Sequence, residues 1–308
     1  MGISFQNAQF ILGASPATGV GSTLTIGRLQ LFLSGREVAD MEQRLGLGPT
    51  EVAACREPYA DSFLKSVLGA SEVTSLDYSA YEGASIVHDM NVPIPKHLEM
   101  LFDTVIDGGT LEHVFNFPVA LANCMRLLKR GGSLFIFAPA NNQMGHGFYQ
   151  FSPELLYRAL SPAHGFQVER MRAQEFRYVG LELGTRGPLL DVVDPAVLAT
   201  RTVVTSGRPV GLFVHATKAA HMERPFDQAP QQSDYVSTWT AKASDGAEQG
   251  STWARIVASI SWRLPPAVKW PIWNEYGRLY RNTLRNRRWF RPVLAPQPGP
   301  RQSARQEP

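Results

Sequence analysis

Short runs rich in β-branched residues alternate with longer helical patterns from about residue 23 to residue 218, and this alternation limits the fold more than any other feature. Such an order is typical of a parallel sheet with crossover helices on both faces. The run at 133–138 is apolar on both faces, as a strand between two helical layers should be. We therefore predict an α/β fold with seven strands, at residues 23–26, 72–76, 85–88, 102–106, 133–138, 166–171 and 210–217.

The composition is that of a folded, reduced protein. The chain has 308 residues, of which 44% are hydrophobic and 19% are charged, so it can bury a core and is not disordered throughout. Two cysteines exclude a disulfide framework. No run of about 18 uncharged apolar residues is present, and the start lacks the basic front of a secretory signal. We expect a cytoplasmic protein.

A basic aromatic segment lies near the end of the chain. Residues 253–291 hold nine Lys or Arg against one acid, and five of the six tryptophans. We expect a helix that starts at Pro271. Such a helix docks on its own domain or a second copy, or rests on an anionic membrane at the inner face of the cell. Nucleic acid is disfavoured because the rest of the chain is acidic and holds no reader module.

Composition also suggests the domain boundaries. We expect one domain over 1–218, a linker over 219–250, a basic helical extension over 251–291 and a disordered tail over 292–308. About 46 residues separate the first two strands, more than one crossover helix requires, so we expect an insertion near 34–58.

Three predicted strands end in acidic residues. Ligands of an open parallel sheet bind beyond the carboxyl ends of its strands, so these residues are the first candidates for a site. Asp77 follows the second strand, Asp89 the third, and Asp107 with Gly108 and Gly109 the fourth. A carboxylate can accept both hydroxyls of a ribose, and glycines let backbone approach a ligand.

These strand ends resemble the middle of a class I S-adenosylmethionine-dependent methyltransferase, most closely the small-molecule type with a Leu-Glu-His-Val element after strand four. The segments that carry the resemblance are Leu76-Asp77, Ile86-Val-His-Asp89, Phe102-Asp-Thr-Val-Ile-Asp107, Thr110-Leu-Glu-His-Val114, Leu127-Leu-Lys-Arg-Gly-Gly132 and Phe135-Ile-Phe-Ala-Pro139. The resemblance implies a Rossmann-like seven-stranded sheet whose last strand is antiparallel, with S-adenosylmethionine as cofactor. It also implies that Asp77 binds the ribose, that Asp89 and Met90 face the adenine, and that Asp107 to Gly109 lie near the methionine portion.

The first strand departs from this pattern. The family ends it with a Gly-x-Gly-x-Gly turn, whereas this chain offers a single Gly27 followed by Arg28. A guanidinium binds a carboxylate with two parallel hydrogen bonds, so Arg28 either replaces the turn by pairing with the cofactor carboxylate or blocks the site.

Methyl transfer needs an aligned acceptor and, for a hydroxyl, a base that removes its proton. His113, His146 and Tyr149 are the candidates for this base. Some members of the family hold a metal through a Glu three residues before the Glu-His pair. That position is Gly109 here, so we expect no metal. The resemblance implies transfer to a small-molecule acceptor, and the basic aromatic segment adds a sugar or lipid-linked acceptor near the inner membrane face; a homodimer is compatible with this interpretation. The alternative is a non-catalytic binding or scaffold protein that lost the cofactor turn.

Overall fold

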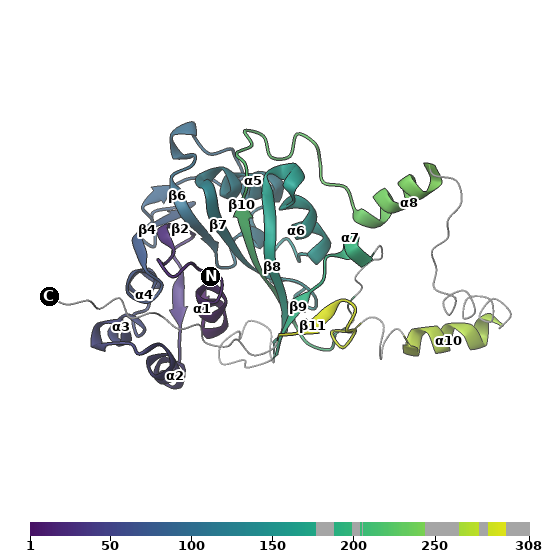
Figure 1. Ribbon diagram of the computed structural model, residues 1–308, viewed down its shortest axis with the longest axis horizontal. Helices are drawn as coiled ribbons and strands as arrows, with labels where there is room; N and C mark the ends of the chain where they lie inside the picture. The colour runs from purple at the N-terminus through teal and green to yellow at the C-terminus, as the bar shows by residue number, and fades with distance from the viewer. Residues whose placement is uncertain (177–187, 199–203, 205, 244–264, 277–282, 294–308) are drawn as a thin grey trace.

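The computed structural model describes residues 1–176, 188–198, 204, 206–243, 265–276 and 283–293. A twisted sheet with helices packed on it makes up most of the molecule (Figure 1). Within the described residues the sheet has nine strands, in the order β11-β9-β8-β10-β7-β6-β2-β4-β5. Their bounds are β2 (Gly21–Ile26), β4 (Ala70–Asp77), β5 (Ile86–Val87), β6 (Phe102–Asp107), β7 (Leu128–Pro139), β8 (Phe166–Glu175), β9 (Leu189–Val192), β10 (Val210–Lys218) and β11 (Phe290–Pro292).

All seven predicted strands are present, as β2, β4, β5, β6, β7, β8 and β10. The first five pair in parallel, and β10 is antiparallel to both β7 and β8. The last of the seven is therefore the antiparallel one, which confirms the predicted Rossmann-like sheet. Strands β9 and β11 extend the sheet beyond β8 and were not expected.

Helices cover both faces of the sheet. Within β7, Leu134 and Ile136 join one buried cluster, while Phe135 and Phe137 join the other. The prediction that this strand lies between two layers is thus confirmed. The helices are α1 (Phe5–Leu12), α2 (Gly35–Leu45), α3 (Pro49–Ala54), α4 (Asp61–Ser66), α5 (Phe117–Leu127), α6 (Pro153–Ala159), α7 (Pro195–Leu198), α8 (Ser233–Ala243) and α10 (Pro266–Tyr276).

A buried lysine ends helix α5. The sequence favours a glycine stop at Gly131 and Gly132, but both residues lie inside β7. The Lys218 ammonium instead donates to the carbonyl oxygens of Met125 and Leu128 at 2.8 and 2.7 Å. Because a cation satisfies the helix-end carbonyls, no glycine cap is needed. Burial is the main cause that lowers the pKa of Lys218 to about 8.

The predicted insertion consists of helices. Ser34 caps α2 through Glu37, and Gly46 ends it in the left-handed conformation; α3 follows. Ahead of α2, a two-stranded parallel sheet joins β1 (Gly2–Ser4) to β3 (Gln30–Phe32). The start of the chain is thereby held beside the residues that follow β2.

The end of the chain differs from the predicted division. Strand β11 pairs with β9, and Trp289 and Phe290 are 5% and 1% exposed in the main core, so the sheet of the first domain includes part of the expected extension. This part packs on the chain's own domain as a strand, whereas the prediction concerned a helix. Within the expected linker, α8 occupies Ser233–Ala243.

Helix α10 begins at Pro266, with Pro271 inside it, so the predicted start at Pro271 is wrong. A proline fits the first helical position because that residue needs no N–H donor, and Pro266 takes that place. Residues 251–264, 277–282 and 294–308, which carry much of the basic segment and the tail, lie outside the described residues. No helix in the described part of the chain is both long and apolar enough to cross a membrane.

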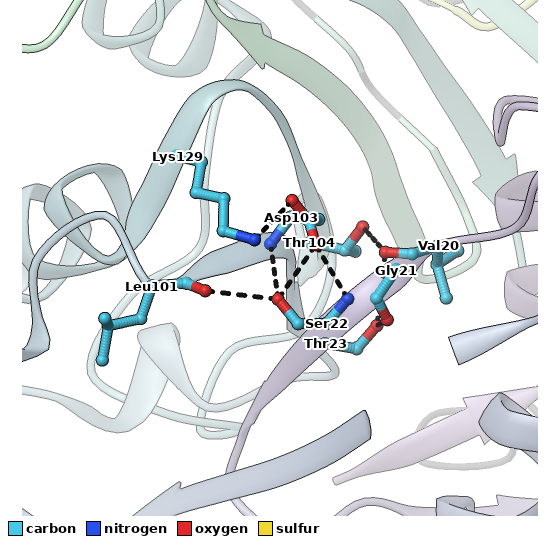
Figure 2. Close-up of polar contacts among 8 residues, drawn as sticks. All are labelled: Val20, Gly21, Ser22, Thr23, Leu101, Asp103, Thr104 and Lys129. Carbon is cyan, nitrogen blue, oxygen red and sulfur yellow. Dashed lines mark hydrogen bonds and ion pairs between the residues drawn. The ribbon is translucent and has the colours of Figure 1, made fainter. Parts of the chain in front are cut away.

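A polar network fixes the central strands at their amino ends (Figure 2). The Asp103 carboxylate accepts from the Ser22 backbone N–H and hydroxyl, both at 3.0 Å, and from the Lys129 ammonium at 2.8 Å. The Thr104 hydroxyl donates to the Val20 carbonyl at 2.7 Å. Burial alone would raise the pKa of Asp103, but the hydrogen bonds from Lys129 and Ser22 lower it.

Asp103→Asn should weaken this network. We expect the free energy of unfolding at pH 7 to fall by about 1 kcal/mol, a small value because the side chain is about half exposed. The pKa of Asp103 is lower in the folded protein than in the unfolded chain, where it is about 3.9. The stabilisation by Asp103 is therefore complete above about pH 3.9 and is lost as the pH falls through the pKa of the folded protein. Urea unfolding across pH 2.5 to 7 should show the two proteins converging in acid. Glu72→Gln on exposed β4 surface is the control, and equal stabilities at pH 7 would contradict the prediction.

Candidate functional site

The register of the central strands brings the candidate residues to one edge. Ile26 at the end of β2 lies level with Leu76 on β4 and with Asp107 on β6. Gly27, Asp77 and Asp107 therefore end three adjacent strands at one height. The expectation that these strand ends meet at a common edge is confirmed.

The turn after β2 is tight and closed. Gly27 has a φ of +75°, and its N–H donates to the Leu76 carbonyl at 2.7 Å. A Cβ at this position would lie 3.1 Å from the Met1 methyl carbon and 3.3 Å from the Thr110 hydroxyl. That hydroxyl donates to the Ile26 carbonyl at 2.8 Å. The chain itself thus occupies the space against Gly27.

The start of the chain also covers the turn after β6. The Gly2 N–H donates to the Gly108 carbonyl at 3.0 Å. Leu29 is 2% exposed, and a Cβ on Gly108 would lie 2.7 Å from one of its methyl carbons. Met1, Gly2 and Leu29, which we call the edge cover, therefore fill the region where the resemblance places the methionine portion of the cofactor.

Arg28 is engaged by the chain's own groups. Its guanidinium lies 4.1 Å from the centre of the Tyr59 ring and donates to the Glu82 carbonyl at 2.9 Å. Its Nε lies 3.5 Å from an Asp61 carboxylate oxygen. Pairing with a cofactor carboxylate would require the side chain to leave these partners. The arrangement resembles the blocking alternative more than the replacing one.

The residues expected at the nucleoside divide into accessible and buried ones. Asp77 is half-buried, and one of its oxygens accepts from the Tyr78 N–H at 2.6 Å. Asp89 is also half-buried and accepts from the Asn91 backbone and side-chain N–H groups at 2.8 Å, which lowers the pKa of Asp89. Met90 is 5% exposed and belongs to the core, so it is positioned for packing.

Asp107 and Glu112 form a buried pair of carboxyl groups, 0% and 1% exposed. One Asp107 oxygen accepts from the backbone N–H groups of Thr110 and Leu111 at 2.9 and 3.3 Å. The second oxygen of each carboxyl has no hydrogen-bond partner among the described residues. Burial first, and the charge of Glu112 second, raise the pKa of Asp107 well above its usual value. Asp107 is thus fully buried and held through one oxygen by the backbone of its own turn.

His113 and His146 meet over Glu112. Their ring centres lie 5.4 Å apart, and their Nε2 atoms lie 3.9 and 3.5 Å from one Glu112 oxygen. The two side chains are 45% and 31% exposed, so the cluster opens toward solvent. Its ligand atoms all lie within 4.8 Å of one another, so the three residues could hold a metal ion. The structure brings together two residues that the sequence analysis singled out separately.

Tyr149 lies close by in a different role. Its hydroxyl donates to the Phe115 carbonyl at 2.6 Å, and its ring packs against Phe117 and Phe151. Phe115 and Phe148 form an edge-to-face pair at 5.8 Å, and both are exposed. With its donor already used, Tyr149 fits a positioning residue for this loop better than a base.

Glu112 and the edge cover were not predicted from the sequence as parts of the site. The position of Glu112 beside His113 in the Leu-Glu-His-Val element was the one sequence signal for its role. The burial of Glu112 against Gly109 depends on the fold and has no such signal. A Cβ on Gly109 would lie 3.2 Å from a Glu112 oxygen. Leu29 follows Arg28 in an ordinary apolar run, and no local pattern assigns it to the edge.

The chain has low similarity to several solved structures. No family model and no curated protein matches it. A methyltransferase from Thermotoga maritima is 17% identical over 69% of this chain and 86% of its own, with a TM-score of 0.34. Burkholderia thailandensis 1,6-didemethyltoxoflavin-N1-methyltransferase, bound to S-adenosylhomocysteine, is 18% identical over 70% and 78%, with a TM-score of 0.37. A Catenulisporales acidiphilia 16S rRNA adenine methyltransferase is 13% identical over 72% and 96%, with a TM-score of 0.33.

All three matches are methyltransferases. Their acceptors range from a small molecule to ribosomal RNA, so they do not single out an acceptor. At such scores they assign no role to any residue of this chain. The strand order and the antiparallel β10 are what support the fold.

The edge fits the two halves of S-adenosylmethionine unequally. Asp77 and Asp89 offer half-buried carboxylates at the ends of β4 and β5, as a nucleoside requires. The methionine half does not fit this arrangement, because the edge cover lies against Gly27 and Gly108. Binding of the whole cofactor therefore requires the edge cover to move.

The packing of Leu29 on Gly108 gives a direct test. Gly108→Ala places a methyl group against Leu29 and the Gly2 carbonyl, and we expect a loss of about 1–3 kcal/mol in unfolding free energy. Leu29→Ala should cost about 2–5 kcal/mol through the cavity it leaves. Because Leu29→Ala removes the atoms that the new methyl group would meet, the double variant should lose less than the two losses added together.

Urea unfolding of the four proteins measures this coupling. Leu31→Ala, in the same buried cluster, is the control partner and should add to Gly108→Ala without coupling. Additive effects of the 29 and 108 substitutions would show that Leu29 does not cover the turn.

Proposed function

We propose that this protein transfers a methyl group from S-adenosylmethionine to a small-molecule acceptor. The observation that carries the proposal is the common edge where Asp77 ends β4, and where Glu112 and His113 after β6 meet His146 after β7. In this proposal the Asp77 carboxylate binds the nucleoside and the polar cluster receives the acceptor, since both lie at the same edge of the sheet.

The bound cofactor would supply an electrophilic methyl group. What the chain must add is alignment of the acceptor and removal of its proton. His113 and His146 are the groups proposed to contact the acceptor, since both are partly exposed above buried Glu112. Asp77 is proposed to hold the ribose. Tyr149 positions the loop that carries His146.

The surroundings of the histidines suggest the character of the acceptor. Phe115 and Phe148 are 71% and 68% exposed and stand on the two loops that carry the cluster. Exposed aromatic side chains beside polar groups suit an acceptor with an apolar or ring-shaped part next to the atom that is methylated. Sugar or lipid-linked acceptors with such a part fall within this class.

A second candidate is a binding protein without transfer activity. It is favoured by the edge cover, which fills the methionine half of the site, and by Arg28, which is held by Asp61 and Glu82. Such a protein would recognise a nucleoside through Asp77 and would have no use for the sulfonium half of the cofactor.

Calorimetry on the full chain separates the two candidates. Titration with S-adenosylmethionine, S-adenosylhomocysteine and adenosine should give saturable binding of all three if the chain is an enzyme. Asp77→Ala should weaken each about 10-fold or more, because a hydrogen bond to a charged group contributes about 1.5–3 kcal/mol. Glu72→Ala, an exposed acid on the same strand, should leave the affinities unchanged.

The two candidates give different calorimetric results. Binding of adenosine without S-adenosylmethionine or S-adenosylhomocysteine supports the second candidate. Binding of S-adenosylmethionine that Leu29→Ala strengthens shows that the edge cover competes with the methionine half. No heat from any of the three at millimolar concentration overturns the proposed methyl transfer.

A further inference from the structure

We propose that Glu112, His113 and His146 form a binding site for a first-row divalent metal ion of the Zn²⁺ type. The family resemblance predicts no metal here, because Gly109 stands where some members have a carboxylate ligand. The fold supplies a different third ligand, since the loop after β7 carries His146 back over Glu112.

The spacing is close to that of a formed site. Zinc binds histidine nitrogens and carboxylate oxygens at about 2.0–2.2 Å in a tetrahedron, so two of its ligand atoms lie about 3.3 Å apart. Here one Glu112 oxygen lies 3.5 Å from His146 Nε2 and 3.9 Å from His113 Nε2. All three donors lie within 4.8 Å of one another. Small rotations of two partly exposed imidazoles would complete the geometry.

Burial of Glu112 gives an independent reason to expect a cation. The side chain is 1% exposed, and its second oxygen has no hydrogen-bond partner among the described residues. The ion-pair partners found for Glu112 in the described chain are imidazoles, which carry charge only when protonated. A buried carboxylate without full compensation is costly, and Asp107 is buried beside it. A bound cation would offset both charges.

The donor set indicates the class of metal. Two imidazole nitrogens and one carboxylate oxygen suit Zn²⁺ and neighbouring transition metals, whereas Mg²⁺ and Ca²⁺ prefer oxygen ligands. Three protein ligands leave at least one coordination position open, as in catalytic sites. Gly109 contributes by its size, because a Cβ there would lie 3.2 Å from the Glu112 oxygen.

The open position would face solvent, on the side where His113 and His146 are exposed. A metal at this place can bind an acceptor oxygen and lower its pKa, so that no imidazole base is needed. This role in acceptor activation rests on the proposed function. The metal site itself does not.

Titration of the tag-free, chelator-treated full chain with Zn²⁺ alone tests the site. We expect one ion per chain by calorimetry, without S-adenosylmethionine present. Co²⁺ in the same site should give visible absorption bands of a tetrahedral ion. His146→Ala and His113→Ala should each weaken Zn²⁺ binding at least about 10-fold, the lower limit seen even for groups that only support ligands. His97→Ala, at an exposed histidine away from the cluster, is the control and should change nothing.

Glu112→Gln tests the carboxylate, but a buried substitution can unfold the chain. The two histidine variants lie on exposed surface, and circular dichroism confirms their fold, so the test does not depend on Glu112. No saturable binding of Zn²⁺, Co²⁺ or Mn²⁺, or binding unchanged in both histidine variants, overturns the proposal. Zn²⁺ binding without S-adenosylmethionine binding would overturn the proposed function alone, and the reverse result would overturn the metal site alone.

Discussion

The parallel pairing of β2 with β4 and β6 is the constraint on which the candidate site depends. It places Ile26, Leu76 and Asp107 at one height, so every loop that follows these strands starts from the same edge. The Asp103 network joins β2, β6 and β7 at the opposite ends of these strands. A slip of this register would separate Asp77, the carboxylate proposed to bind a nucleoside, from the histidine cluster, and neither could then act with the other.

Burial of the Asp107 and Glu112 carboxyl groups costs free energy, because both lose contact with water. The hydrogen bonds and imidazoles of the chain offset only part of this cost. Each carboxyl group has one oxygen without a hydrogen-bond partner among the described residues. The other oxygen of Asp107 accepts from the backbone of its own turn, whereas the other oxygen of Glu112 lies beside two imidazoles. Structures retain such groups where a ligand or a reaction uses them. Chemistry is therefore expected at Glu112 more than at Asp107.

The sequence predicted what depends on local patterns. Period and β-branching located seven strands, and acidic strand ends located Asp77 and Asp107. It did not predict β11, since Phe290 and Trp289 are read locally as part of a basic segment and only the core shows where they pack. Lys218 ends α5 from a distant strand, so the nearby glycines were misleading. Glu112 and His146 meet through a loop closure that no spacing encodes, and the contact of Leu29 with Gly108 is of the same kind.

The two halves of the edge differ in how many of their polar groups have hydrogen-bond partners within the described chain. Around Gly27, the backbone N–H and the Thr110 hydroxyl have carbonyl partners, and the edge cover excludes other atoms. A ligand at that half must replace interactions already made, which reduces its affinity by their free energy. Around Glu112, a ligand would gain contacts that the chain leaves open. The affinity for a cation at the cluster is thus independent of whether the first half opens, and a chain that had lost methyl transfer would still bind the metal.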